Sequence, residues 1–141
     1  MVTIEFEVVR LLTQVGLLSS WAGLHDEAQC ILQAAAEQAP TVAQIRNCQA
    51  LALFAAGRHD EAVAMLNATV EDFPTDDMAR ATLAFVLKQL NRPGWSLLAR
   101  SVDRDAQQPE AQWLARHTLG LDPQPSAAAR AHQVVLAGGT A

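Results

Sequence analysis

The stretch AGLHDEAQCIL at residues 22–32 decides the fold, because it recurs as AGRHDEAVAML at residues 56–66. The match between the two copies extends downstream, where Pro40 of the first corresponds to Pro74 of the second. A fixed period of about 34 residues indicates a repeat architecture, in which each unit is one supersecondary element.

A third, more divergent copy follows at the same offset. Asn91 stands there in place of the turn glycine, and the proline comes one position late, at Pro109. Upstream of each turn, a small residue stands at the same position in every copy: Gly16, Ala50 and Ala84. Small residues at fixed places let paired helices approach closely, so we predict that these three are packing positions.

The His, Asp, Glu and Cys of residues 25–30 raise the question of a metal or catalytic site. A metal site needs ligands that converge from one face, and His25 with Cys30 offers a single unfavourable pair. The second copy has Ala64 in place of the cysteine. We therefore expect no metal site here.

The repeated turn explains the same residues structurally. Gly23 and Gly57 are predicted to end one helix as C-terminal caps. Asp26 and Asp60 are predicted to stand where the next helix begins, because a carboxylate there accepts backbone N–H groups and favours the positive end of the helix dipole.

Composition favours a compact helical domain with protein partners. The chain has 141 residues, half of them apolar, and a formal net charge of −5. Lys88 is the single lysine, and the arginines are scattered, which disfavours nucleic acid and anionic membranes as partners. No apolar run is long enough to span a membrane, and the N-terminus MVTIEFEVVR is acidic where a secretory signal is basic. We expect a cytoplasmic protein without membrane insertion.

Two cysteines are too few for a disulfide framework. Cys30 and Cys48 fall within helical segments and form no C-x-x-C motif. We expect both to be buried or half-buried thiols without a redox role.

The repeated pattern resembles the tetratricopeptide repeat, a helix-turn-helix unit, over residues 9–109. The resemblance implies an all-α fold of three divergent repeats at about 9–42, 43–76 and 77–109, with capping helices at 109–137. We expect a single domain at 1–137 and a disordered tail at 138–141. The expected helices are at about 3–21, 26–38, 41–56, 60–72, 75–90 and 93–102, followed by 109–120 and 127–136, with Pro93 in the first turn of its helix.

In tetratricopeptide arrays the first helix of each repeat lines a concave groove, which places large apolar residues of this chain at groove positions. These candidate partner-binding residues are Leu17, Trp21, Leu51, Phe54, Phe85 and Trp113. A lining of this kind suits an amphipathic helix with anchors at i, i+3, i+4 and i+7. The alternative is that a short, divergent array buries these side chains in its own core.

Two longer segments narrow the resemblance. FPTDDMARATLAFVLKQLNRPGWSLLARSV, residues 73–102, is similar to the third-repeat region of Hrp-type type III secretion proteins of plant pathogens. LLARSVDRDAQQPEAQWL, residues 97–114, is similar to the C-terminal part of chaperones for the needle subunit. The resemblance implies a non-enzymatic chaperone or adaptor that holds an amphipathic helix of a small secretion subunit and prevents premature polymerisation. A second small co-chaperone is a further partner that it suggests.

Other classes of function remain as alternatives. A general interaction scaffold, or a homodimer whose groove is closed by a second copy, would use the same apolar residues. An enzyme is disfavoured because His117 and His132 stand alone and no nucleophile elbow, zinc motif or phosphate loop is present. We expect no catalytic residues and no cofactor.

Overall fold

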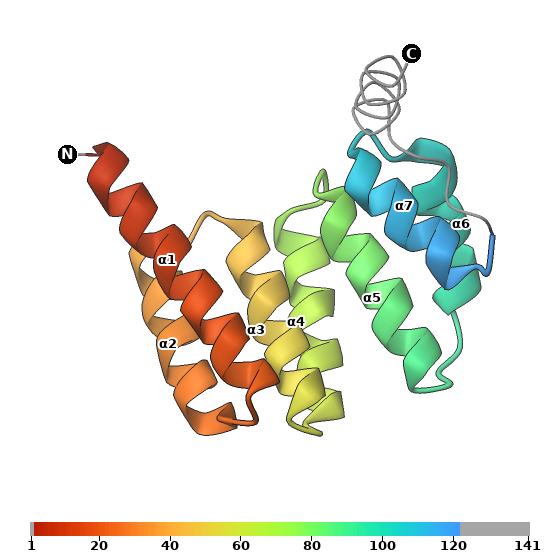
Figure 1. Ribbon diagram of the computed structural model, residues 1–141. Coiled ribbons are helices and arrows are strands. Elements are labelled where there is room, and N and C mark those ends of the chain that lie inside the picture. Colours follow the sequence, from red (N-terminus) through yellow and green to blue (C-terminus); the bar gives the residue numbers. More distant parts are fainter. Residues whose placement is uncertain (1, 122–141) are drawn as a thin grey trace, which may run out of the picture. The chain divides into compact units, whose positions relative to one another are not determined.

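The computed structural model describes the backbone of residues 2–121 and the side chains of residues 7–121. These residues form seven α-helices and no strand (Figure 1). The helices are α1 (Val2–Trp21), α2 (His25–Gln38), α3 (Ala43–Ala55), α4 (His59–Asp72), α5 (Asp77–Gln89), α6 (Trp95–Asp105) and α7 (Pro109–Thr118). The predicted all-α class is confirmed.

Consecutive helices pack in pairs, and the pairs fall into two compact units. The first unit ends at Ala79 and contains the α1–α2 and α3–α4 pairs, with α2 and α1 also contacting α3. The second unit begins at Arg80 and contains the α6–α7 pair. Assignment of the pairs to tetratricopeptide repeats stays a prediction, as does the extent of the domain. The predicted helix at 127–136 and the tail at 138–141 lie outside the described residues.

The turns after α1, α3 and α5 occupy equivalent places in successive repeats and have one geometry. Gly23, Gly57 and Asn91 adopt positive φ values of 83°, 81° and 55°. In each turn the following N–H donates to the carbonyl five positions back, at 2.9 Å: Leu24 to Ser19, Arg58 to Leu53 and Arg92 to Leu87. This left-handed cap satisfies carbonyl groups that a helix end otherwise leaves unpaired. The predicted C-terminal caps are confirmed, including the asparagine variant.

The predicted starts of two helices lie within one residue of those in the structure, but the expected side-chain caps are absent. Helices α2 and α4 begin one residue earlier than expected, and their N-cap residues, Leu24 and Arg58, make no side-chain cap hydrogen bond. Asp26 and Asp60 therefore lie inside the first turn, where their charge still favours the positive end of the dipole.

The start of α6 also differs from the prediction. Pro93 was expected in the first helical turn, but α6 begins at Trp95. The cap residue Gly94 has a φ of 92°, and a left-handed residue cannot continue a right-handed helix. Pro93 therefore lies in the connection before the helix.

The first unit is held together by apolar residues of α1, α2 and α3. One core cluster joins Val9, Ala35 and Ile45, and the other joins Leu32, Cys48 and Ala52 with Leu17 packed against it. At Gly16 a Cβ atom would lie 2.7 Å from the buried Leu32 side chain, closer than atoms can pack. The predicted role of Gly16 as a packing position is confirmed.

The burial of Cys30 was predicted wrongly. Helix α2 turns Ala28, Leu32 and Ala35 inward, a spacing of four and three residues that defines one face. Cys30 falls on the opposite face and is exposed, whereas Cys48 in α3 is buried as expected.

In the second unit, Lys88 links three helices. Its Nζ donates to the carbonyl oxygen of Thr118 in α7 at 2.5 Å and lies 5.1 Å from the ring centroid of Trp95 in α6. Arg116 in α7 forms an ion pair with Asp103 in α6 at 3.3 Å. The one lysine of the sequence is therefore a structural residue.

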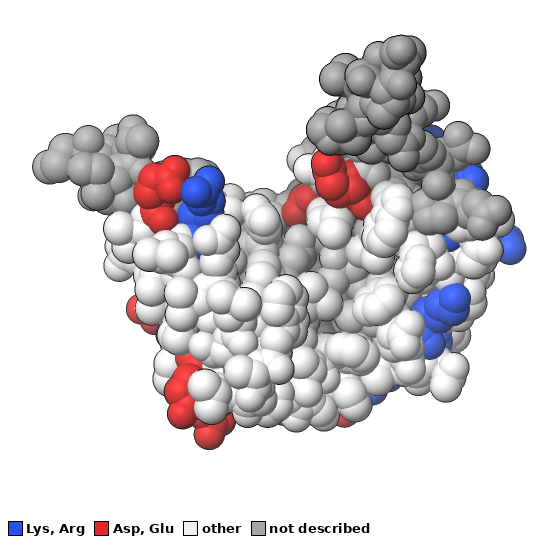
Figure 2. All heavy atoms as spheres, in the orientation of Figure 1, with Lys and Arg blue, Asp and Glu red and all other residues white. Residues whose placement is uncertain are grey.

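Charge is divided unevenly along the sequence. Residues 1–79 hold three arginines and eleven carboxylates, a net charge of −8, whereas residues 80–121 hold six basic and three acidic residues, a net charge of +3. Over α1 the charged groups gather near the N-terminal end, and a wide uncharged surface follows (Figure 2). The first unit is thus acidic in total but carries an uncharged area on this helix.

Candidate functional site: a groove between two helices

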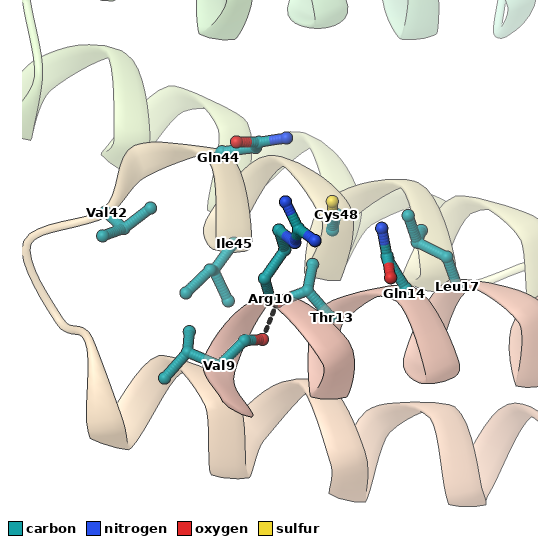
Figure 3. Close-up of a pocket in the computed structure, with 9 residues that line it drawn as sticks. All are labelled: Val9, Arg10, Thr13, Gln14, Leu17, Val42, Gln44, Ile45 and Cys48. Carbon is teal, nitrogen blue, oxygen red and sulfur yellow. Dashed lines mark hydrogen bonds between the residues drawn. The ribbon is translucent and has the colours of Figure 1, made fainter. Parts of the chain in front are cut away.

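A cavity of about 240 Å³ lies between α1 and α3 in the first unit (Figure 3). Its lining residues come from these two helices and the residue that precedes α3: Val9, Arg10, Thr13, Gln14, Leu17, Val42, Gln44, Ile45 and Cys48. Along α1 they recur every three or four residues, the spacing of one helix face. The two helices therefore form the walls of an elongated groove.

The floor of the groove is apolar and neutral. Val9 and Ile45 are buried, and the Thr13 hydroxyl donates to the carbonyl oxygen of Val9 at 2.9 Å. Burial raises the pKa of the Cys48 thiol from its ordinary value of 9.0 to about 11, so the thiol is uncharged at physiological pH. A ligand on this floor would meet apolar groups and satisfied hydrogen bonds.

The rim of the groove is polar. Arg10, Gln14 and Gln44 are exposed, and their side chains are drawn with those of the floor in Figure 3. Arg10 also forms an exposed ion pair with Glu7 at 3.2 Å, one turn back on α1. An apolar floor with a polar rim suits an elongated, amphipathic ligand better than a small polar substrate.

Leu17 is the one predicted partner-binding residue that lines this cavity. Trp21 lies one turn further along the same side of α1 and is 75% exposed. Leu51 is half-buried and lies one turn beyond Cys48 on α3. By helical spacing, Trp21 and Leu51 continue the line of the groove beyond its lining residues.

The remaining predicted residues lie elsewhere. Phe54 is half-buried near the end of α3 and contacts the His59 ring, with 5.3 Å between centroids. Phe85 is half-buried in α5, and Trp113 is exposed in α7, where its ring stacks on His117 at 5.3 Å. Phe85 and Trp113 belong to the second unit.

Sequence reasoning missed the polar part of the groove. Under the predicted tetratricopeptide assignment, Arg10, Thr13 and Gln44 also stand at positions that line the groove. The prediction was restricted to large apolar side chains, and these three side chains are polar. Helix-face spacing alone, without the apolar criterion, would have found all three.

The described residues hold neither a metal-binding cluster nor a membrane-spanning helix. They contain no group of three or more His, Cys, Asp or Glu side chains placed to hold a metal ion. Within the same range, every helix is too short or too polar to cross a bilayer.

Comparison with known proteins identifies the family. No curated protein matches the sequence. The family described as bacterial type III secretion protein (HrpB1_HrpK) matches residues 1–121, which include both helix pairs of the first unit, the groove and the α6–α7 pair. The chain belongs to the bacterial type III secretion protein family HrpB1_HrpK.

Proposed function

We propose that this protein is a non-enzymatic chaperone or adaptor of type III secretion. It holds an amphipathic helix of a small, needle-type secretion subunit in the groove between α1 and α3. A subunit that polymerises through amphipathic helices stays monomeric while one of those helices is covered. The remaining predicted partner-binding residues, Phe54, Phe85 and Trp113, are further proposed contacts for the client.

The observation that carries the proposal is the chemistry of the groove. Its floor, built around Val9, Ile45 and Cys48, is apolar and uncharged, and its rim carries Arg10 and Gln14. An amphipathic helix matches both parts, because its apolar stripe meets the floor and its polar flanks meet the rim.

Trp21 supplies the strongest candidate anchor. Its side chain is 75% exposed in the free protein, which leaves a large apolar surface in water. Tryptophan is enriched among residues that dominate binding energy. Covering one such anchor stabilises a complex by about 1.5–3 kcal/mol before the entropy of association is counted.

The holding function depends on competition. Binding must outweigh self-association of the subunit at its cellular concentration, yet allow release at the export machinery. A moderate affinity is enough to keep the subunit monomeric, because binding lowers the concentration of free subunit and only free subunit polymerises. No nucleotide is needed for this exchange.

The test is to co-express the tagged full chain with the type III secretion proteins of the same bacterium. The purified complex is weighed by light scattering, and its components are identified by mass spectrometry. We expect a complex with one small helical secretion subunit, and Trp21→Ala is expected to weaken its retention about tenfold or more.

Leu97→Ala is the matched control, since Leu97 is an exposed apolar residue of α6 outside the groove. The control is expected to retain the subunit at the wild-type level. A dimer of the chain with nothing attached would favour the competing reading, in which a second copy closes the groove. Undiminished retention by Trp21→Ala would mean that Trp21 does not anchor the client.

A further inference from the structure

Helix α1 carries a second apolar surface, separate from the groove. Val8, Leu11, Val15 and Leu18 are between 40% and 59% exposed and follow one another at intervals of three, four and three residues. We call these four residues the outer stripe. This alternating spacing is the pattern by which one helix packs along another.

The outer stripe and the groove occupy different sides of α1. At 100° per residue, the buried residues Val9, Gly16 and Ser20 lie nearly opposite the stripe. The groove residues Gln14 and Leu17 lie between those two faces. Helix α1 is therefore apolar on opposite sides, a pattern typical of a helix that is covered on both.

The sequence repeat shows what covers the equivalent face of α3. Leu11, Val15 and Leu18 correspond to Ile45, Gln49 and Ala52, which are between 2% and 4% exposed. Helix α2 provides the cover through these contacts: Ile45 clusters with Ala35, Ala52 clusters with Leu32, and Gln49 Nε2 donates to Gln33 Oε1 at 3.1 Å. This face is covered by a helix on α3, whereas the equivalent face of α1 is exposed.

The charge of the first unit distinguishes between possible occupants. A second copy docked through its own outer stripe would bring together two units that each carry a net charge of −8. Like charges that meet at an interface oppose association. A helix with basic flanks is instead attracted by the same field.

Two exposed carboxylates belong to the helix that carries the stripe and to the helix that follows it. Glu7 lies four residues before Leu11, on the neighbouring turn of α1, and is exposed even though it forms an ion pair with Arg10. Glu27 is exposed in the first turn of α2, just beyond the turn that ends α1. We propose that the outer stripe docks an amphipathic helix of a different protein, with apolar residues at the same alternating spacing and Lys or Arg on its flanks.

The test uses two synthetic helical peptides of about twenty residues, the length that matches α1. Both carry the same Leu and Val stripe at alternating spacings of three and four residues, and their flanks carry either Lys or Glu. Fluorescence anisotropy measures binding to the full-length protein at low and at high salt. We expect the Lys-flanked peptide to bind at least about tenfold more tightly than the Glu-flanked one, and the difference to shrink at high salt because screening weakens exposed charge interactions.

Variants locate the binding surface. Leu11→Asp and Leu18→Asp are expected to weaken binding of the Lys-flanked peptide by at least about tenfold, and Leu97→Asp, the matched control in α6, to leave it unchanged. Circular dichroism verifies that each variant is folded. The double variant Glu7→Lys with Glu27→Lys reduces the net charge of the first unit from −8 to −4 and is expected to narrow the preference between the two peptides.

Three results would overturn the proposal. Equal binding of both peptides would show that charge does not select the occupant, and full binding by Leu11→Asp would show that the stripe is not the surface. A wild-type dimer in light scattering that Leu18→Asp converts to a monomer would make a second copy the occupant.

Discussion

Helices α1 and α3 precede the two copies of the recurring sequence and end in the same left-handed turn, yet they differ in which faces are covered. Leu11 is 59% exposed and its counterpart Ile45 is buried. The difference arises because α3 follows α2 and packs against it, whereas no helix of the described residues covers the outer stripe of α1. A repeated sequence thus gives repeated turns, but the burial of each copy depends on its neighbours.

The largest expected effect tests this contrast directly. Ile45→Ala removes buried side-chain volume and is expected to lower the free energy of unfolding by about 2–5 kcal/mol. Leu11→Ala, at the same place in the repeat, is expected to change it by less than about 0.5 kcal/mol. Urea denaturation followed by circular dichroism measures both. A cost for Leu11→Ala as large as that for Ile45→Ala would mean that the outer stripe is covered in solution.

The second prediction concerns pH. Cys48 is buried in α3, and its counterpart in α1 is the exposed Gln14. Burial raises the pKa of Cys48 from 9.0 to about 11, so the folded state holds the thiol proton more tightly than the unfolded state does. This contribution to stability is fully present below pH 9 and is lost as the pH rises to 11, with a total on the order of 2 kcal/mol.

The measurement compares wild type with Cys48→Ala in denaturant melts from pH 8 to pH 11. The wild type is expected to lose more stability over this interval than the variant. Parallel curves would show that the thiol is solvated. Maleimide labelling sharpens the result, since the exposed Cys30 is expected to react quickly and Cys48 slowly.

The third prediction concerns the small residue at equivalent places in the two helices. Gly16→Ala places a Cβ atom 2.7 Å from Leu32. We expect a net loss of about 1 kcal/mol, because overpacking costs about 1–3 kcal/mol and the gain in helix propensity returns about 1 kcal/mol. Ala50→Gly is expected to cost about 1 kcal/mol for a different reason, the backbone entropy of glycine.

A double-mutant cycle separates the two reasons, with stability read from thermal melts. In a Leu32→Ala background the crowding is relieved, so Gly16→Ala is expected to become neutral or stabilising. Ala50→Gly is expected to cost the same in that background. Persistence of the Gly16→Ala penalty would mean that its origin is not contact with Leu32.

The smallest expected effect concerns the turns that all copies share. Asn91 adopts the same left-handed geometry as Gly57, with a φ of 55°. Asn91→Gly is expected to stabilise the protein by about 0.5 kcal/mol, less than the roughly 1–2 kcal/mol that an ordinary residue loses in this region, because asparagine tolerates it better than most. Gly57→Asn is expected to show the opposite sign in the same melts. A loss of stability in Asn91→Gly would indicate that the asparagine side chain contributes a contact of its own.

The sequence by itself determined the helical class, the turns and the family. The turns could be predicted from Gly23, Gly57 and Asn91 because only a few residue types tolerate a positive φ. This tolerance depends on the local backbone and not on distant contacts. Errors occurred where a neighbour mattered, as at Pro93, where Gly94 delays the helix. Of the predicted binding residues, Leu17 reaches the cavity and Trp21 and Leu51 extend its line.

Only the tertiary structure decided which faces are covered. Periodicity marked Cys30 and Leu11 as members of helices, but it cannot specify which face another helix will occupy. That choice depends on contacts between segments distant in sequence, such as Val9 with Ile45 and Leu32 with Ala52. The groove between α1 and α3 and the uncovered outer stripe both follow from those contacts, because burial is a property of packed neighbours and not of the residue alone.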